Sequence, residues 1–436
     1  MDLTLKIPLE SFVRLYSQMN HLEYRNFVKH SLQVAKMTKH MVELLKLDTD
    51  LECAYLAGLL HDIGLALKAS IENYELFVDM FRRVPDLEKI VLTFDKHDQH
   101  AVLSYMIARY AKPLCPYCAK SILYHHTPYQ EIREDKTIVI FSNVLKMADT
   151  ISLIVLRNED EELTLELFQR IIDSILKNTT VLDDVKKAAF HMVQDYKILC
   201  ELLDDEPRFS SQRIIDSLEF EHLARILASL LDMRSPYTRN HTFLAARFAK
   251  AVAKELLAEE DSNFINLAML LHDLGKLKTP LSVLHKPARL NEKELYIMKM
   301  HVVDTYRMLE NAGLINFAKV SASHHERLDG SGYPMGLKSE KISIYQRIVQ
   351  VCDVFSALIE HRPYREAMNV EQALEVVSKE VEEGKLDKTV YEKLRELVKN
   401  ESFPERGIFQ NVLESILNVS YEEIKEKIKV SPFEEG

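Results

Sequence analysis

The sequence predicts an all-α protein that consists of two related helical domains. Glycine is scarce, with 10 residues among 436, whereas Leu, Glu, Lys and Ala recur at helical spacing. The sequence shows no sustained alternation of apolar and polar residues with hairpin turns, which a β-sheet would require. One motif occurs twice, as LAGLLHDIG at Leu56–Gly64 and as LAMLLHDLG at Leu267–Gly275, with 7 identical positions and an offset of 211 residues. We therefore expect two tandem helical bundles.

The helices of the N-terminal half follow from the spacing of its apolar residues. We expect helices over Leu9–Tyr24 and Arg25–Leu47, because apolar residues recur there every three or four positions. A third helix is expected over Leu51–Gly64, where the closing glycine favours a helix end. Residues 159–205 predict two further helices.

A domain boundary is expected near the middle of the chain. The run Asp204–Pro207 combines three acidic residues with a proline, which is typical of a linker. We therefore predict one domain over residues 1–205 and another over residues 206–436. The second domain repeats the helical plan of the first, and amphipathic helices follow Met368, the clearest over Asp387–Lys399.

Composition limits where the protein works and what it binds. The formal net charge is −11, so a broad basic face for DNA or RNA is not expected. No apolar run reaches the roughly 18 residues of a membrane span, and the N-terminus lacks the pattern of a signal peptide. The 5 cysteines, an odd number, suit a reducing compartment. We expect a soluble cytoplasmic protein.

Each half also carries one ordered set of residues of the metal-ligand type. The offset of 211 that aligns the two motifs also carries His30 onto His241. A lone histidine is more often a packing or surface residue, but 10 of the 17 histidines fall into the two sets. The first set is His30, His61, Asp62, His100, His125, His126 and Asp149, and the second is His241, His272, Asp273, His301, His324, His325 and Asp353.

The second set predicts a centre of two metal ions. We assign one ion to His241, His272, Asp273 and Asp353, and the other to Asp273, His301, His324 and His325. Two ions about 3.5–4 Å apart would acidify a shared water, and the resulting bridging hydroxide would attack phosphorus. Five nitrogen ligands suit Fe or Mn better than Mg, which prefers oxygen. A further metal site is expected in the first domain.

Several residues of the second domain suit a phosphate-containing substrate. Lys276 follows the HD motif, where the first copy has Leu65, and a lysine there can hold a phosphate as a point charge. Compensation of charge at a helix end is the alternative. Arg362 and Arg365 are three residues apart and can share a phosphate, or can equally form salt bridges at the surface.

A glycine-rich loop follows the paired histidines of the second domain. In HHERLDGSGYPMG three glycines lie within seven residues, which permits close approach to a ligand. Tyr333 offers a ring for base stacking. A plain tight turn is the alternative. A CxxC pair at Cys115 and Cys118 could be a zinc or redox site, although a loop beside Pro113 and Pro116 is the simpler interpretation.

The second domain resembles the HD-GYP family of bacterial cyclic-dinucleotide phosphodiesterases, a branch of the HD metal-dependent phosphohydrolases. The resemblance covers roughly Leu223–Asn400 and rests on HDLGK, HHERLDGSGYP and DVFSALIEHRPYR. It implies hydrolysis of cyclic di-GMP to linear pGpG at a centre of two or three metal ions, and it leaves further hydrolysis to GMP open. Some members place a glutamate four residues before the first histidine ligand for a third ion. Tyr237 stands there in this chain, which favours two ions.

The first domain, roughly Arg25–Leu156, resembles a general HD domain. It retains the ligand set but lacks the lysine, and His125 and His126 run into TPYQEIRED instead of a GYP loop. Three roles stay open: a second phosphohydrolase, a metal-bound regulatory domain, or a dimerisation partner.

Two alternatives to the cyclic di-GMP prediction concern substrate and class. A 3′,3′-cyclic GMP-AMP would fit the same phosphate and metal ligands. The protein would otherwise be a non-catalytic, metal-bound sensor of cyclic dinucleotides that signals to a partner. For the enzyme we expect Asp273 and Lys276 to act in catalysis, and Lys276, Tyr333, Arg362 and Arg365 to bind substrate. A homodimer and a protein partner at the GYP loop are further hypotheses.

Overall fold

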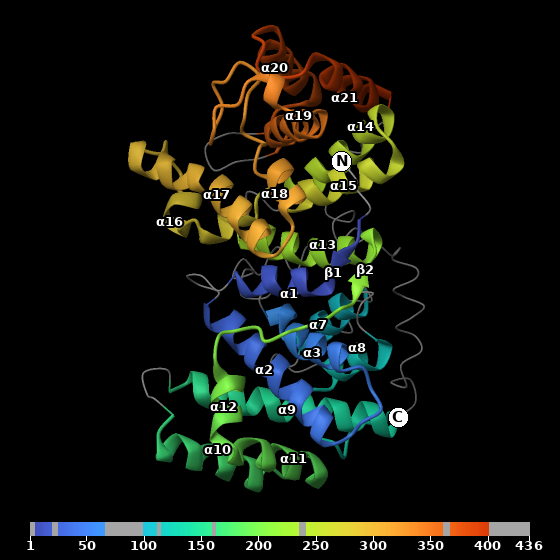
Figure 1. The fold of residues 1–436 in the computed structure, drawn as a ribbon, viewed down its shortest axis with the longest axis vertical. Coiled ribbons are helices and arrows are strands. Elements are labelled where there is room, and N and C mark those ends of the chain that lie inside the picture. Colours follow the sequence, from blue (N-terminus) through green and yellow to red (C-terminus); the bar gives the residue numbers. More distant parts are fainter. Residues whose placement is uncertain are drawn as a thin grey trace. The chain divides into compact units, whose positions relative to one another are not determined.

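The protein is built almost entirely of α-helices in the computed structural model (Figure 1). The all-α class predicted from the sequence is thereby confirmed. The structure describes residues 5–19, 25–65, 99–110, 115–158, 163–234, 241–360 and 367–400.

The chain divides into two compact units. Among the described residues, the N-terminal domain comprises residues 16–212, and the C-terminal domain comprises residues 5–15 and 213–400. Residues 5–15 join the second unit because strand β1 (Ile7–Pro8) pairs antiparallel with strand β2 (Ile214–Ile215). These strands form a two-stranded sheet. The boundary after residue 205 stays our proposal for the limits of the two HD domains.

The helices of the two domains follow the repeated plan. After α1 (Leu9–Ser17), the N-terminal domain contains α2 (Arg25–Leu44), α3 (Leu51–Leu60), α7 (Gln99–Tyr110), α8 (Pro116–Leu123), α9 (Lys136–Leu156), α10 (Leu165–Lys177), α11 (Asp183–Gln194) and α12 (Tyr196–Leu203). The C-terminal domain contains α13 (Ser217–Arg234), α14 (His241–Leu256), α15 (Glu259–Leu270), η2 (Leu274–Lys278), α16 (Leu281–Leu284), α17 (Glu292–Asn311), α18 (Ile315–Ser321), η3 (Ser339–Lys341), α19 (Ile344–Leu358), α20 (Val370–Glu382) and α21 (Lys388–Asn400).

The region after residue 159 contains three helices, α10, α11 and α12, where the sequence predicted two. Asp195 has an extended backbone, ends α11, and accepts a hydrogen bond from the amide of Ile198 as the N-cap of α12. A polar residue between two amphipathic stretches can lie on the surface of one long helix or cap a new one. Periodicity alone does not distinguish these cases. The predicted first helix is also shorter than expected and ends at Ser17.

Helix α9 passes the length and composition test for a membrane span, contrary to the expectation that no segment would. Of the described helices it is the one that does so, yet 61% of its most apolar window is buried inside the protein. It packs against α2, α8, α10 and α11. It also carries the buried carboxylate of Asp149. These features are those of the central core helix of a domain.

A glycine beside the HD motif of each domain permits close helix packing: Gly58 lies in α3, just before the motif, and Gly275 lies in η2, just after it. A Cβ atom at Gly58 would lie 2.6 Å from the Cα atom of Ala35 in α2. At Gly275 it would lie 1.9 Å from the carbonyl oxygen of His301 in α17. Both clashes are with backbone, which cannot move aside cheaply. The two glycines therefore set the distance between elements that carry candidate ligands.

The predicted linker is held against α2 by a buried lysine. The ammonium group of Lys36 donates to the carbonyl oxygens of Glu201 and Asp204 at 3.1 and 2.7 Å, and to the Asp204 carboxylate at 2.6 Å. Burial lowers the pKa of Lys36, although the Asp204 carboxylate opposes the shift. Tyr55 donates a further hydrogen bond to the carbonyl of Pro207. The chain from residue 204 to residue 207 is thus part of the packed N-terminal domain.

We expect Lys36→Met to lower the free energy of unfolding by about 1–3 kcal/mol, because two partly buried carbonyls lose the ammonium group that donates to them, whereas the Asp204 carboxylate still binds Arg208. Lys187→Met is the matched control, since Lys187 and its partner Asp184 are both exposed, and its effect should stay within about 0.5 kcal/mol. Urea unfolding of the full chain measures both. Equal effects would show that the Lys36 contacts do not stabilise the fold.

Candidate metal centres

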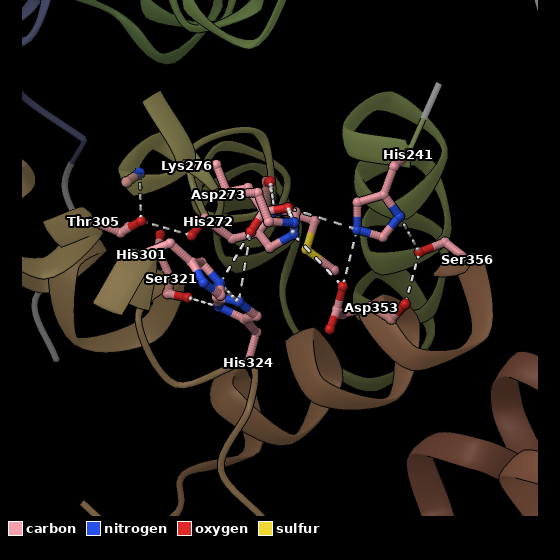
Figure 2. A network of polar contacts seen from close by, with 12 residues as sticks. His241, His272, Asp273, Lys276, His301, Thr305, Ser321, His324, Asp353 and Ser356 are labelled. Atoms are coloured by element: carbon pink, nitrogen blue, oxygen red, sulfur yellow. Dashed lines mark hydrogen bonds and ion pairs between the residues drawn. The ribbon is translucent and has the colours of Figure 1, made fainter. Parts of the chain in front are cut away.

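The C-terminal domain brings all seven predicted ligand residues together in the interior. The residues come from the start of α14 (His241), the turn after α15 (His272 and Asp273), α17 (His301), the turn after α18 (His324 and His325) and α19 (Asp353). Six of the seven side chains are buried, and that of His325 is 26% exposed. Figure 2 shows His241 and Asp353 on one side of Asp273, and His301 and His324 on the other.

The carboxylate of Asp273 lies between two groups of histidines. Its Oδ2 atom is 3.3 Å from Nε2 of His272 and 3.9 Å from Nε2 of His241. Its Oδ1 atom is 3.4 Å from Nε2 of His301 and 3.7 Å from Nε2 of His324. Each oxygen therefore faces a different pair of nitrogens, as a carboxylate that bridges two cations must.

The distances between ligand atoms suit a cation on each side of Asp273. Nε2 of His241 lies 3.0 Å from Oδ1 of Asp353, and the Nε2 atoms of His301 and His324 are 3.1 Å apart. Two ligands bound about 2.0–2.2 Å from one ion are separated by roughly 3.0–3.6 Å at angles between 90° and 110°. The side chains are therefore placed for coordination without rearrangement of the backbone.

The hydrogen bonds of the histidine rings leave their Nε2 atoms free for a metal. Nδ1 of His272 donates to the carbonyl of Met269 at 2.6 Å, and Nδ1 of His324 donates to that of Ser321 at 2.7 Å. Nδ1 of His301 bonds in the same way to a carbonyl three residues earlier. A carbonyl only accepts, so Nδ1 carries a proton and Nε2 is the ring nitrogen left to face a metal. Such partners fix the ring and its tautomer.

A serine that the sequence reasoning missed holds the first histidine of each domain. Ser152 lies 2.9 Å from Nδ1 of His30, and Ser356 lies 3.4 Å from Nδ1 of His241. Since Ser152 donates to Gln33 at 2.7 Å, its oxygen accepts from His30. Each serine follows its cluster aspartate by three residues, so alignment of the two repeats marks this serine position, while the structure identifies the histidine that the serine contacts.

The N-terminal domain reproduces this arrangement around Asp62. Oδ2 of Asp62 is 3.5 Å from His30 and 3.6 Å from His61, and Oδ1 is 3.0 Å from His100 and 3.5 Å from His125. Its seven predicted residues thus form two groups that share Asp62. The groups are His30, His61, Asp62 and Asp149, and Asp62, His100, His125 and His126.

Protonation in the metal-free C-terminal cluster follows from burial and neighbouring charge. Burial alone would lower the pKa of His272, but the carboxylates of Asp273 and Asp353 raise it to about 10. Burial lowers the pKa of His301 to about 4 and that of His324 to about 3. Burial opposes ionisation of Asp273, but His272 holds the pKa of its carboxyl well below the ordinary value. At neutral pH the bridging carboxylate is therefore ionised and two of its histidine neighbours are neutral, the states that bind metal.

Unsatisfied buried atoms of both clusters support cation binding. Buried side-chain atoms without a hydrogen-bond partner occur at several places in the described residues, and four of them lie in the two clusters: Oδ1 of Asp62, Nε2 of His125, Nε2 of His272 and Oδ1 of Asp273. A buried polar atom without a partner costs about 1–3 kcal/mol. All four atoms belong to the candidate ligand groups, so a cation in each group would satisfy them. The donor sets therefore fit divalent metals.

Residues suited to phosphate surround the C-terminal cluster. The ammonium group of Lys276 pairs with Oδ2 of Asp273. The ring of Tyr333 stacks on His325 with centroids 4.8 Å apart. The ammonium group of Lys299, which the sequence reasoning did not single out, lies 4.8 Å from the centroid of the Tyr333 ring. In the N-terminal domain the position of Lys276 is occupied by Leu65, whose side chain is exposed.

A buried glutamate holds the glycine-rich loop. The carboxylate of Glu326 accepts hydrogen bonds from the amides of Met335 and Leu337, both at 2.7 Å. The carbonyl of His325 accepts from the amide of Tyr333 at 3.1 Å. Gly332 has no room for a side chain, because a Cβ atom there would lie 2.4 Å from the nitrogen of Arg327. The loop is therefore fixed to the segment that carries the paired histidines, which places Tyr333 beside them.

Two predicted substrate contacts cannot be placed. Arg362 and Arg365 lie outside the described residues, as does Tyr237. The two arginines therefore stay predictions.

Comparison with known proteins gives the same two-domain division. A family profile described as HD domain matches residues 221–390, and another of the same description matches residues 27–164. Over 391 residues the chain is 29% identical to 3′3′-cGAMP-specific phosphodiesterase 1 of Vibrio cholerae. This alignment covers 84% of the present chain and 86% of that protein.

Other relatives match one domain or share the fold. Over 169 residues the chain is 41% identical to the cyclic di-GMP phosphodiesterase response regulator RpfG of Xanthomonas campestris, covering 38% of this chain and 44% of that protein. A solved structure of a cyclic GMP-AMP-specific phosphodiesterase of V. cholerae covers 90% of this chain and 98% of that chain, with a TM-score of 0.57 and 20% identity. At that identity the likeness concerns the fold.

We expect Glu326→Ala to loosen the loop of residues 330–337. The two amides that donate to this carboxylate would lose hydrogen bonds that contribute about 1.5–3 kcal/mol each. Hydrogen exchange at these amides should therefore accelerate roughly ten-fold or more. Glu326→Gln keeps one acceptor and should give an intermediate effect. Hydrogen exchange followed by mass spectrometry measures the change. Glu340→Ala is the control, because Glu340 is exposed. Unchanged exchange in Glu326→Ala would show that the carboxylate does not hold the loop.

Proposed function

The chain belongs to the HD-GYP family of HD-domain hydrolases, and we propose that its C-terminal domain hydrolyses a phosphodiester bond of a cyclic dinucleotide. The observation that carries this proposal is the convergence of three features at one place. The paired ligand groups around Asp273, the ammonium of Lys276 and the ring of Tyr333 lie together in a single domain.

The proposed metal ligands are the seven residues predicted from the sequence. His241, His272, Asp273 and Asp353 would hold one ion, and Asp273, His301, His324 and His325 the other. Two ions held there would lower the pKa of a water molecule and neutralise charge on the phosphoryl oxygens. We propose Fe or Mn, because the donor set is rich in nitrogen. HD domains bind divalent metals, and both clusters have ligand groups of the required kind.

The protein's own side chains supply charge and orientation. Lys276 places a positive charge next to the bridging carboxylate, where a substrate phosphate would approach. Lys299 adds a second ammonium close to Tyr333. The Tyr333 ring offers a face for a base, and its position against His325 links base binding to the ligand group. The buried neighbours of Asp273 exclude bulk water, which strengthens these charge interactions.

Two cyclic dinucleotides are candidate substrates. Our prediction from the sequence is cyclic di-GMP, converted to linear pGpG, and RpfG is 41% identical to this chain over 169 residues. The alternative is 3′3′-cyclic GMP-AMP. It is favoured by the relative that matches across both domains, which is specific for that compound. The residues around Asp273 contact phosphate and metal and do not read the bases, so substrates must be compared directly.

The N-terminal domain is proposed as a second metal-binding domain without this substrate chemistry. Its two groups share Asp62, whose two oxygens face separate pairs of histidines as those of Asp273 do. It has Leu65 in place of the lysine, and no counterpart of the GYP loop follows His126. Of the roles left open, a metal-bound regulatory domain agrees best with complete ligand groups and with a leucine at the position of Lys276. A cytoplasmic location, a homodimer and a signalling partner at the GYP loop stay predictions.

We expect full-length protein loaded anaerobically with Fe²⁺ or Mn²⁺ to convert a cyclic dinucleotide into its linear form. The double variant His272→Ala with Asp273→Ala should lose more than about a hundred-fold in rate, the loss seen when residues that only orient metal ligands are removed. The matched variant His61→Ala with Asp62→Ala should keep its rate. Chromatography of products from cyclic di-GMP and 3′3′-cyclic GMP-AMP, assayed in parallel, measures both.

The pattern of loss assigns the activity. Turnover that survives the substitutions in the C-terminal domain and disappears with those in the N-terminal domain would assign the reaction to the N-terminal domain and contradict the proposal. Tight binding of both compounds by the metal-loaded protein without cleavage would favour the non-catalytic sensor.

We expect Lys276→Met to reduce kcat/KM by roughly ten- to a hundred-fold, the size of one lost hydrogen bond to a charged group. Lys278→Met is the matched control, because Lys278 lies on the same short helix and faces Asp304 at 3.9 Å. Metal content measured by elemental analysis should be unchanged in both variants. Equal kinetics in the two variants would mean that Lys276 does not bind phosphate.

A further inference from the structure

Three cysteine side chains of the N-terminal domain converge at a place that the proposed chemistry does not use. Cys53 lies in the first turn of α3, Cys115 is the N-cap of α8, and Cys118 lies in the first turn of α8. Their sulfur atoms all lie within 4.8 Å of one another. None of the three forms a disulfide, and Cys53 and Cys118 are buried whereas Cys115 is partly exposed.

The spacing of the three sulfurs is close to that of a tetrahedral thiolate site. With Zn–S bonds of about 2.3 Å, sulfurs of such a site lie roughly 3.8 Å apart. The observed sulfurs lie within 4.8 Å of one another. Small rotations of the cysteine side chains would bring them to the tetrahedral spacing. A disulfide would use two of the thiols and leave the third without a role. A metal ion uses all three.

The local electrostatics favour negative charge at this place. Helices α3 and α8 both begin here, and helix N-termini carry partial positive charge that lowers thiol pKa values. The amide of Cys115 donates to the sulfur of Cys53 at 3.3 Å.

The equivalent position of the C-terminal domain shows what fills this space when cysteines are absent. The repeat offset that aligns the HD motifs carries Cys53 onto Phe264. Alignment of the paired histidines carries Cys118 onto Phe317. These two phenylalanines stack with centroids 4.5 Å apart and 22° between their planes. The same two positions thus meet in both domains, through aromatic packing in one and through thiols in the other.

We propose that Cys53, Cys115 and Cys118 bind one Zn²⁺ ion, separate from the histidine clusters. Thiolates without histidine select a soft or borderline ion, and zinc needs no redox partner. The described residues supply three ligands, so water or an external ligand takes the fourth position, on the partly exposed side of Cys115.

The position of this site gives it a structural role. The two helices that start at the cysteines end at the candidate metal ligands, α3 at His61 and α8 shortly before His125. The rings of His61 and His125 lie 5.2 Å apart. The helices are in contact and run in the same direction. A zinc ion at their N-termini would therefore fix the relative position of the ligands at their C-terminal ends.

Elemental analysis and cobalt spectroscopy of the full-length protein test the proposal. We expect the wild-type protein to hold one zinc ion per chain at this site. Cys115→Ser should lose this ion, because its affinity for zinc should fall by more than about ten-fold. Serine is a favoured N-cap, so this variant should keep the fold, which circular dichroism checks. With Co²⁺ in place of zinc, sulfur-to-cobalt charge-transfer bands should appear in wild type and be lost in Cys53→Ser and Cys115→Ser. His61→Ala and Cys200→Ser, at an exposed cysteine of α12, should retain them.

Two results would overturn the site. One is a cobalt-loaded wild-type protein without charge-transfer bands, because histidine and carboxylate ligands give none. The other is a disulfide between Cys115 and Cys118 in protein purified anaerobically, detected by mass spectrometry after alkylation. Neither result depends on the activity of the C-terminal domain, so the cysteine site and the proposed phosphodiesterase activity are tested independently.

Discussion

The position of one carboxylate, that of Asp273, is the constraint around which the C-terminal domain is arranged. A carboxylate can face two cations only when each oxygen points to a separate ligand group, and here the oxygens face His272 and His301. The groups arrive from five different helical elements, so the helices must end or cross at this point. Gly275 has no side chain because the carbonyl of His301 occupies that space. Close helix packing and ligand placement are therefore one requirement.

The two domains share this framework and differ in what surrounds it. Asp62 divides its neighbours as Asp273 does, and carbonyls three residues earlier orient the histidines of both domains. At the positions that correspond in the repeat, the C-terminal domain has Lys276 and the glycine-rich loop with Tyr333, whereas the N-terminal domain has Leu65 and a segment after His126 without these glycines. The difference lies in residues that would meet substrate, whereas the residues that would meet metal are retained. Such a division suits one catalytic domain and one metal-bound regulatory domain.

The helix ends of the N-terminal domain have opposite chemistry. Carbonyl-rich C-terminal ends of α3 and α8 face the histidine cluster, where cations are expected, and amide-rich N-terminal ends face the cysteines, where thiolates are expected. In the C-terminal domain, Phe264 and Phe317 fill the corresponding space and stabilise the pair of helices by packing. Exchange of an aromatic stack for thiols leaves the backbone plan intact while creating a place for an ion.

Much of this protein is determined by its sequence alone. The repeated HD motif and its offset predict two helical domains and name both ligand sets, because metal ligation demands particular residue types in a fixed order. Helix periodicity predicts the class but not whether Asp195 lies on a helix or begins one. Only the tertiary structure decides that Ser152 holds His30 and that Cys53 joins a CxxC pair 62 residues away. These contacts join residues distant in sequence, and no local pattern records which helices pack together.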